Sequence, residues 1–151
     1  MAVQSAVKPS LTVKRRFKAP PAKVFAAFTD PEKVKHWMGP GEMKAVLAEG
    51  EVRIGGRYRW VMQSPAGQQM EVSGVYREIV PNEKLVFTWA WKVAPPDTSH
   101  ESLVTVLLKP DGEGTLFTLT HENLYDEDSR NGHERGWIGA LDKMQRFVDG
   151  A

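Results

Sequence analysis

The sequence contains no cysteine, which excludes disulfide bonds, thiolate metal sites and a cysteine nucleophile. It also lacks an unbroken apolar run long enough to span a membrane. Its first ten residues, MAVQSAVKPS, contain no apolar core of the kind that signal peptides carry. We therefore expect a cytoplasmic protein that does not insert into membranes.

An excess of charge of one sign is lacking too, because 20 Lys and Arg residues against 19 Asp and Glu residues give a formal net charge of +1. A dedicated nucleic-acid-binding domain usually carries a basic excess, so we do not expect nucleic acid as a partner. The histidines at positions 36, 100, 121 and 133 do not show metal-ligand spacing, and neither a G-x-S-x-G nor a phosphate-loop motif occurs. The sequence therefore predicts no metal and no cofactor.

A chain of 151 residues is long enough for one domain with a substantial core. We predict a flexible tail over residues 1–9 and a single domain over residues 10–151. Alternating residues over 11–18 predict a first strand, and Pro20-Pro21 and Asp30-Pro31 predict the starts of two short helices. Further alternating segments separated by turns, and by a proline-containing loop over 94–99, predict about six antiparallel strands.

Residues 127–148 predict one long amphipathic helix. Asp126 is its predicted N-cap, and the acidic Glu127 and Asp128 suit the positive end of the helix dipole. Ile138 and Phe147 widen its apolar face. Spacings of four, three and four residues place the central stripe on one side of the helix: Trp137, Leu141, Met144 and Val148.

Three glycines, Gly132, Gly136 and Gly139, interrupt this helix at spacings of four and three. Each glycine costs a helix about 1 kcal/mol relative to alanine. Such a row marks a side where another segment approaches the backbone closely or where space is left open. We predict that this side lies at the edge of a pocket, with Trp137 and Leu141 facing inward.

The fold class is therefore predicted to be α+β. A curved antiparallel sheet of six or seven strands wraps around the long C-terminal helix, which is the only predicted element large enough to cover the buried face. The inward positions are rich in aromatic residues and methionine, which suit either a cavity for an apolar ligand or a filled core. The candidate ligand-binding residues are Trp37, Met38, Trp60, Met62, Val72, Tyr76, Phe87, Trp89, Phe117, His121, His133, Trp137, Leu141 and Met144.

Short motifs distributed over nearly the whole chain carry a family resemblance. They are Arg15 with Ala19-Pro20 and Val24-Phe25, Thr29-Asp30-Pro31, Trp37-Met38-Gly39-Pro40, Gly55-Gly56-Arg57-Tyr58, Ser73-Gly74-Val75-Tyr76 with Glu78-Ile79, Leu85-Val86-Phe87-Thr88-Trp89, Gly114-Thr115 with Leu119-Thr120-His121, and Gly136-Trp137. This set resembles the heat shock protein 90 ATPase activator-like group of the SRPBCC (START/birch-pollen-allergen-like) superfamily. No catalytic signature is among these motifs, and many relatives carry a second aromatic residue where this chain has Met38.

The resemblance implies a helix-grip fold with an apolar cavity between the sheet and the long helix. Superfamily members bind lipids, sterols, polyketides and plant phenolics, and some branches are cyclases or dehydratases. The first hypothesis is therefore binding of a lipid-, polyketide- or flavonoid-like molecule, and catalysis is left open. The alternative is a cyclase- or dehydratase-type enzyme that uses His121 or His133 as acid or base.

The second alternative is a co-chaperone-like protein-interaction domain. The co-chaperone that names the group carries a separate N-terminal domain, which does not fit within this chain. We therefore do not expect its activity to follow from the resemblance. A homodimer is left open.

Overall fold

The computed structural model describes residues 8–92 and 100–150. Within these ranges, the elements follow the predicted order of a strand, two short helices, six further strands and a long final helix. They are β1 (Leu11–Phe17), α1 (Pro21–Thr29), α2 (Pro31–Val34), β2 (Lys44–Gly50), β3 (Arg57–Gln63), β4 (Gln69–Val80), β5 (Lys84–Trp91), β6 (Ser102–Asp111), β7 (Gly114–Glu122) and α3 (Glu127–Asp149). The predicted loop over 94–99 and most of the predicted tail over 1–9 lie outside the described residues.

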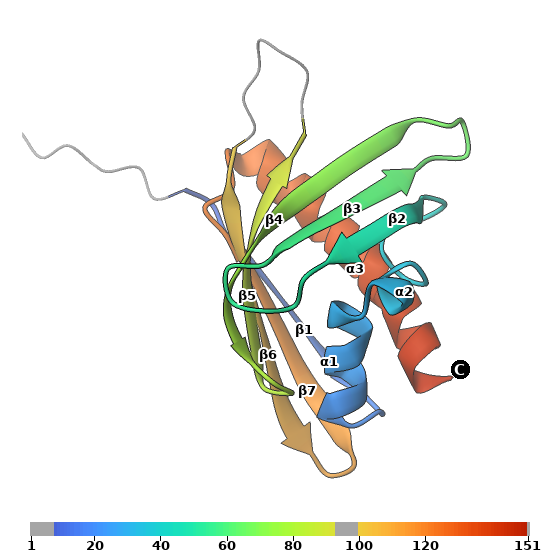
Figure 1. The fold of residues 1–151 in the computed structure, drawn as a ribbon, viewed down its shortest axis with the longest axis vertical. Helices are drawn as coiled ribbons and strands as arrows, with labels where there is room; N and C mark the ends of the chain where they lie inside the picture. Colours follow the sequence, from blue (N-terminus) through green and yellow to red (C-terminus); the bar gives the residue numbers. More distant parts are fainter. Residues whose placement is uncertain (1–7, 93–99, 151) are drawn as a thin grey trace, which may run out of the picture.

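The strands form one antiparallel sheet in the order β1-β7-β6-β5-β4-β3-β2, so the first strand of the chain pairs with the last. The sheet curls, and α3 runs along its concave side with α1 and α2 beside it (Figure 1). This arrangement confirms the predicted α+β helix-grip fold. Because β1 and β2 are the two edges, the five strands between them are paired on both sides.

The curvature of the sheet coincides with irregular pairing. The register shifts after Ala45 in β2 and after Tyr76 in β4, and bulges of this kind bend a strand and increase its twist. β4 and β5 also approach closely at Gly74, where an added Cβ would lie 1.9 Å from the carbonyl oxygen of Thr88. The hydroxyl of Tyr58 donates a hydrogen bond to the same carbonyl oxygen. Glycine at this position therefore allows three strands to meet.

The helix start predicted at Asp30-Pro31 and the N-cap predicted at Asp126 are confirmed. The side chain of Asp30 accepts a hydrogen bond from the backbone N–H of Glu32 at 3.0 Å, with Pro31 in the first turn of α2. The side chain of Asp126 accepts one from the backbone N–H of Ser129 at 2.8 Å. Each carboxylate satisfies a donor that the helix itself leaves unpaired.

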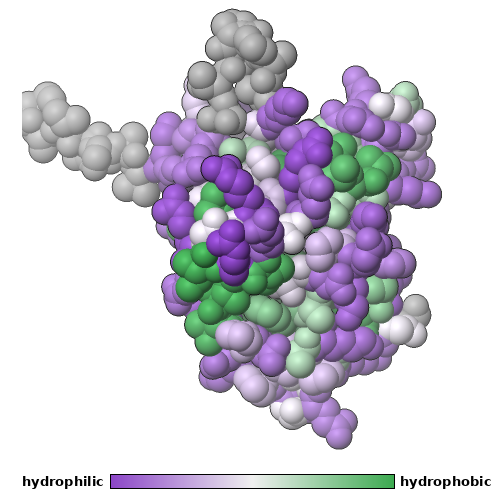
Figure 2. Space-filling model, in the orientation of Figure 1, coloured by the Kyte–Doolittle hydropathy of each residue, from purple (hydrophilic) through white to green (hydrophobic). Residues whose placement is uncertain are grey.

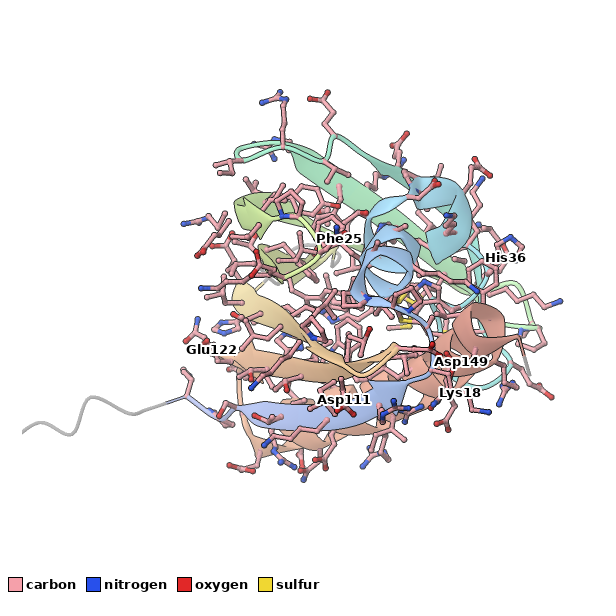
Figure 3. All side chains as sticks on the ribbon, turned by 90° about the horizontal axis from the view of Figure 1, so that it is seen from below. Lys18, Phe25, His36, Asp111, Glu122 and Asp149 are labelled. Carbon is pink, nitrogen blue, oxygen red and sulfur yellow. The ribbon has the colours of Figure 1, made fainter. Side chains whose placement is uncertain are left out.

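Two contacts fix α3 to β1 and to the residue that follows it. The guanidinium of Arg15 donates a hydrogen bond to the carboxylate of Asp142 over 2.8 Å. At the end of the helix, the carboxylate of Asp149 accepts a hydrogen bond from the backbone N–H of Lys18 at 3.0 Å, and the two residues lie side by side in Figure 3. In each of these two contacts the partners lie more than 120 residues apart in the chain, so the contacts join the first strand region to the last helix.

The central stripe of α3 is buried as predicted: Trp137, Leu141, Met144 and Val148. The prediction that Ile138 and Phe147 widen this face is wrong, since their exposed fractions are 43% and 36%. The sheet covers only the narrower stripe. Phe147 instead stacks on the ring of His36, which follows α2, with the ring centroids 4.6 Å apart.

Buried apolar side chains form one core cluster, and Figure 3 shows that side chains fill the space between the sheet and the helices. Polar residues cover most of the face drawn in Figure 2, although apolar residues gather where β4, β5 and β6 run. Leu107 of β6 is 45% exposed. No helix in the described part of the chain is long and apolar enough to cross a lipid bilayer.

Candidate functional site

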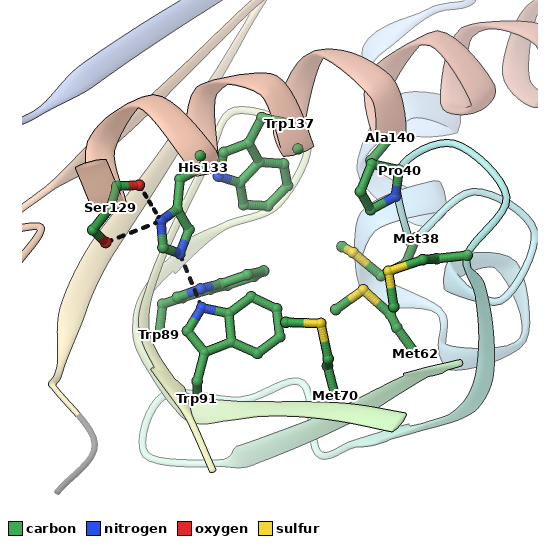
Figure 4. A pocket seen from close by; sticks show the side chains of 13 residues that line it. Met38, Pro40, Met62, Met70, Trp89, Trp91, Ser129, His133, Trp137 and Ala140 are labelled. Atoms are coloured by element: carbon green, nitrogen blue, oxygen red, sulfur yellow. Dashed lines mark hydrogen bonds between the residues drawn. The ribbon is translucent and has the colours of Figure 1, made fainter. Parts of the chain in front are cut away.

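A cavity of about 330 Å³ lies between α3, the β3–β5 part of the sheet and the loop that follows α2 (Figure 4). Indole rings and thioether groups make up most of its wall. The lining residues are Met38, Pro40, Met43, Met62, Met70, Trp89, Trp91, Ser129, Gly132, His133, Gly136, Trp137 and Ala140. The cavity is therefore predominantly apolar, with few polar groups at its surface.

The glycines of α3 leave room on the helical side of this cavity. No atom would lie within 4 Å of a Cβ at Gly132, and a Cβ at Gly136 would only just reach Pro40, at 4.0 Å. At Gly139 an added Cβ would lie 3.1 Å from the Cβ of Pro40. Gly132 and Gly136 thus line the cavity, whereas Gly139 lets the loop after α2 pack against the helix.

This loop, residues 38–43, forms one wall of the cavity and is held against α3 by Lys143. The ammonium group of Lys143 donates hydrogen bonds to the carbonyl oxygens of Gly39 at 2.7 Å and Met43 at 2.8 Å. Gly39 and Gly41 have φ values of 110° and 59°, which favour glycine. Burial lowers the pKa of Lys143 from its ordinary value. Lys143 of α3 thus holds this loop wall in place through two hydrogen bonds.

Four methionines line the cavity, and Met38, Met62 and Met70 extend their side chains into the same space in Figure 4. The fourth is Met43. Met38 and Met62 are buried, whereas Met70 is 47% exposed and stands at the mouth. Thioether side chains are flexible and polarizable, so this wall can adapt to ligands of different outline.

His133 lies on the cavity wall, and both of its ring nitrogens are engaged (Figure 4). Nδ1 lies 2.7 Å from the carbonyl oxygen of Ser129, and Nε2 accepts a hydrogen bond from the indole N–H of Trp91 at 2.9 Å. A carbonyl can only accept, so Nδ1 carries the proton and the ring is neutral. Burial lowers the pKa of His133, which agrees with a neutral ring.

His121 is fully buried behind the wall and belongs to a second hydrogen-bonded chain. Its Nδ1 accepts from the indole N–H of Trp137 at 3.0 Å, and its Nε2 lies 2.7 Å from the hydroxyl of Ser102. That hydroxyl donates to the carbonyl oxygen of Trp89 at 3.1 Å, so Nε2 must donate to the hydroxyl. Burial, with a smaller contribution from His133, lowers the pKa of His121 to about 3.

The hydrogen bonds of His121 and His133 determine what these two side chains can do chemically. The rings of His121 and His133 lie 4.9 Å apart between centroids, and a neutral imidazole with both nitrogens bonded has no free site for a substrate proton. Within the described residues the buried indole N–H of Trp89 has no hydrogen-bond partner, and the indole packs against the rings of Trp91, His121 and His133. Among the described residues, no three His, Asp or Glu side chains are arranged to hold a metal ion.

The structure brings five of the fourteen candidate ligand-binding residues together at the cavity: Met38, Met62, Trp89, His133 and Trp137. The other nine are buried but do not line it: Trp37, Trp60, Val72, Tyr76, Phe87, Phe117, His121, Leu141 and Met144. Phe28 of α1 explains much of this difference, because its ring contacts those of Trp37, Phe87 and Phe117 and fills that part of the concave face.

Eight lining residues are absent from the candidate set; Gly132 and Gly136 were predicted separately at the pocket edge, and the other six are Pro40, Met43, Met70, Trp91, Ser129 and Ala140. Met70 and Trp91 lie on the inward positions of their alternating strands, so periodicity could have included them. Pro40, Met43 and Ser129 carry no comparable signal, because a loop or a helix start has no period that points to one face.

Comparisons with a family model and with solved structures point to the same family and fold. The family model described as "Activator of Hsp90 ATPase homolog 1-like protein" matches residues 18–149. A solved protein of Chromobacterium violaceum is 26% identical, with a TM-score of 0.85 over 93% of this chain and 96% of that one. The AHSA1 protein of Silicibacter pomeroyi is 28% identical, with a TM-score of 0.81 over 93% and 97%. No curated protein matched.

CalU16 of Micromonospora echinospora is also similar, with 26% identity and a TM-score of 0.69 over 92% of this chain and 75% of that one.

The fold and the site define a helix-grip domain with an apolar cavity between the sheet and the C-terminal helix, an architecture that suits a ligand-binding or cyclase-like domain. The chain belongs to the activator of Hsp90 ATPase homolog 1-like family. The resemblance to that group of the SRPBCC superfamily is thereby confirmed.

Proposed function

We propose that the protein binds a small, ring-containing apolar molecule, of lipid-, polyketide- or flavonoid-like character, in the cavity beside α3. The observation that carries this proposal is the lining itself, in which three indoles and four thioethers surround about 330 Å³. That volume lies at the lower end of the range for small-molecule sites, roughly 300–1,000 Å³. Two helical glycines support the proposal further, because they keep space open that leucine or alanine would fill.

A cyclase- or dehydratase-type activity is less well supported. It needs an imidazole with a ring nitrogen within reach of the ligand, and both nitrogens of His121 and of His133 are already bonded within the protein. The family description names an activator of the Hsp90 ATPase, a role that depends on a protein partner. The apolar lining of this cavity suits a small molecule instead. We therefore prefer ligand binding to both alternatives.

The substitution Gly136→Leu tests the proposal, because it fills the cavity from the helix side. We expect at least a tenfold weaker affinity for naphthalene or flavone, measured by NMR titration of the Trp indole and Met methyl signals. The free energy of unfolding should not fall, because leucine is a better helix former than glycine by about 1 kcal/mol.

Arg135→Leu is the matched control, since it adds the same side chain at the adjacent, exposed position of α3. It should leave ligand affinity unchanged. If Gly136→Leu lowers stability but leaves the affinity intact, the glycines serve packing alone. Absence of binding by the unmodified protein would contradict the proposed function itself.

A further inference from the structure

We propose that the cavity selects an uncharged ligand, namely a ring system with one hydroxyl or carbonyl oxygen, and places that oxygen at the hydroxyl of Ser129. This inference rests on the proposed function and specifies its ligand class. It separates neutral phenolic or ketone-like molecules from fatty acids and aromatic carboxylates, which the same apolar volume could otherwise accommodate.

The first step is the charge of the wall. Among the thirteen described lining residues there is no Asp, Glu, Lys or Arg, and His133 is the only side chain that could carry a charge. A carboxylate buried against this wall would lose its hydration without gaining a counterion, and such burial is strongly unfavourable. An uncharged oxygen needs only one hydrogen bond.

The second step excludes His133 as the counterion. A positive charge would require a proton on Nε2, which would then point at the indole N–H of Trp91, donor against donor, across 2.9 Å. The neighbouring ring of His121 is neutral and cannot compensate. The aromatic rings packed against His133, those of Trp89 and Trp91, carry no charge either. The ring therefore stays neutral and offers nothing to an anion.

The third step concerns the start of α3, the positive end of a helix dipole and a common place for anions. Here the first turn carries Glu127 and Asp128, and the N-cap Asp126 already accepts from the backbone N–H of Ser129. Three exposed carboxylates therefore belong to this helix start, and their negative charge opposes the attraction of the helix dipole for an anion. They repel an anionic head group and leave a neutral one unaffected.

The fourth step is the hydroxyl of Ser129, which lines the cavity beside His133. Its nearest side-chain partner is Nδ1 of His133 at 3.4 Å, and the proton of Nδ1 points instead to the Ser129 carbonyl oxygen at 2.7 Å. The hydroxyl can thus donate to a ligand oxygen or accept from one. A single group that both donates and accepts matches a phenol or a ketone equally well.

The experiment compares probes with one ring system and different heads: naphthalene, 2-naphthol, 2-naphthoate and its neutral methyl ester. Affinities are measured by calorimetry near neutral pH with the full chain. We expect 2-naphthol to bind at least fivefold more tightly than naphthalene and at least tenfold more tightly than 2-naphthoate. The methyl ester, with the same ring but no charge, should recover most of the affinity that the carboxylate loses.

Two variants locate the effect. Ser129→Ala should lower the affinity for 2-naphthol to that for naphthalene and leave the affinity for naphthalene unchanged. The helix should stay intact, because its cap uses the backbone N–H of Ser129 and not its hydroxyl. Met70→Arg, at the exposed mouth, supplies the missing counterion and should tighten 2-naphthoate severalfold.

The outcomes separate this inference from the function on which it rests. If 2-naphthoate binds as tightly as 2-naphthol, the selection against charge is wrong while ligand binding stands. If Ser129→Ala lowers the affinities for naphthalene and 2-naphthol equally, or lowers neither affinity, the ligand oxygen does not lie at Ser129. If no probe binds, the proposed function fails and this inference fails with it.

Discussion

At the scale of single residues, His121 combines complete burial with two hydrogen bonds that require a neutral ring. Charging it would remove the acceptor that Trp137 uses and place a positive charge beside His133. The low pKa of about 3 is the thermodynamic expression of this arrangement. The unfolded chain, in which the ring has an ordinary pKa near 6.5, therefore binds protons more readily than the folded protein.

This difference predicts how stability depends on pH. Above pH 6.5 the contribution of His121 is fully present, and it decreases by roughly 1.4 kcal/mol per pH unit as the pH falls towards 3. We expect about 2 kcal/mol less stability at pH 5 than at pH 6.5, measured by urea unfolding. The lowered pKa of His133 acts in the same direction.

His121→Gln should flatten this dependence, because an amide can accept from Trp137 and donate to Ser102 but does not titrate. An unchanged slope in His121→Gln would show that other groups cause the loss.

At the scale of elements, the close approach of β4 and β5 depends on Gly74. A methyl group there would overlap the carbonyl oxygen of Thr88, so the strands would have to separate. We expect Gly74→Ala to lower the free energy of unfolding by about 2 kcal/mol or more, as overpacking and strained positions do. Gly132→Ala is the opposite case, since its Cβ meets open space, and should raise stability by about 1 kcal/mol. Chemical denaturation of both variants checks the two signs.

The loop over residues 38–43 and α3 act together as one wall because Lys143 joins them. Lys143→Met keeps the length of the side chain but removes both hydrogen bonds to Gly39 and Met43. We expect about 1.5–3 kcal/mol lower stability and weaker ligand binding, since hydrogen bonds to charged groups contribute in this range.

Hydrogen exchange provides the local measurement for this variant. The backbone N–H of Met43, which donates to Pro40, should exchange faster, whereas the amides of the β6–β7 pair should not change. Arg146→Met, on the same helix, is the control for loss of a positive charge. Equal exchange of Met43 in the two variants would mean that Pro40 packing against Gly139 holds the loop without Lys143.

At the scale of the whole molecule, the fold could be predicted because each element carries its own periodicity. Alternation places Trp60 and Met62 on the inward face whatever the rest of the chain does, and Asp126 identifies the start of α3. Periodicity gives the side on which a residue lies but not its depth. Whether an inward ring lines a cavity or a filled core depends on Phe28, which comes from a different element.

The cavity was therefore less predictable than the fold. Its helical wall could be anticipated, because glycines in a helix interior are costly and Gly132 and Gly136 line it. Its loop wall could not, since the position of Pro40 depends on Lys143, about a hundred residues away in the chain. The hydrogen-bonded state of His133 likewise depends on Trp91 from a distant strand.

The pairing of β1 with β7 has a consequence for how the protein is made. Leu11 lies opposite His121, so within the described residues the first strand pairs only with a strand that is synthesised about a hundred residues later. At translation rates of about 5–20 residues per second, this strand waits for roughly 5–20 s with Leu11, Val13 and Phe17 uncovered. A ribosome that stalls before residue 114 therefore holds an unpaired, partly apolar strand that is open to association with other nascent chains.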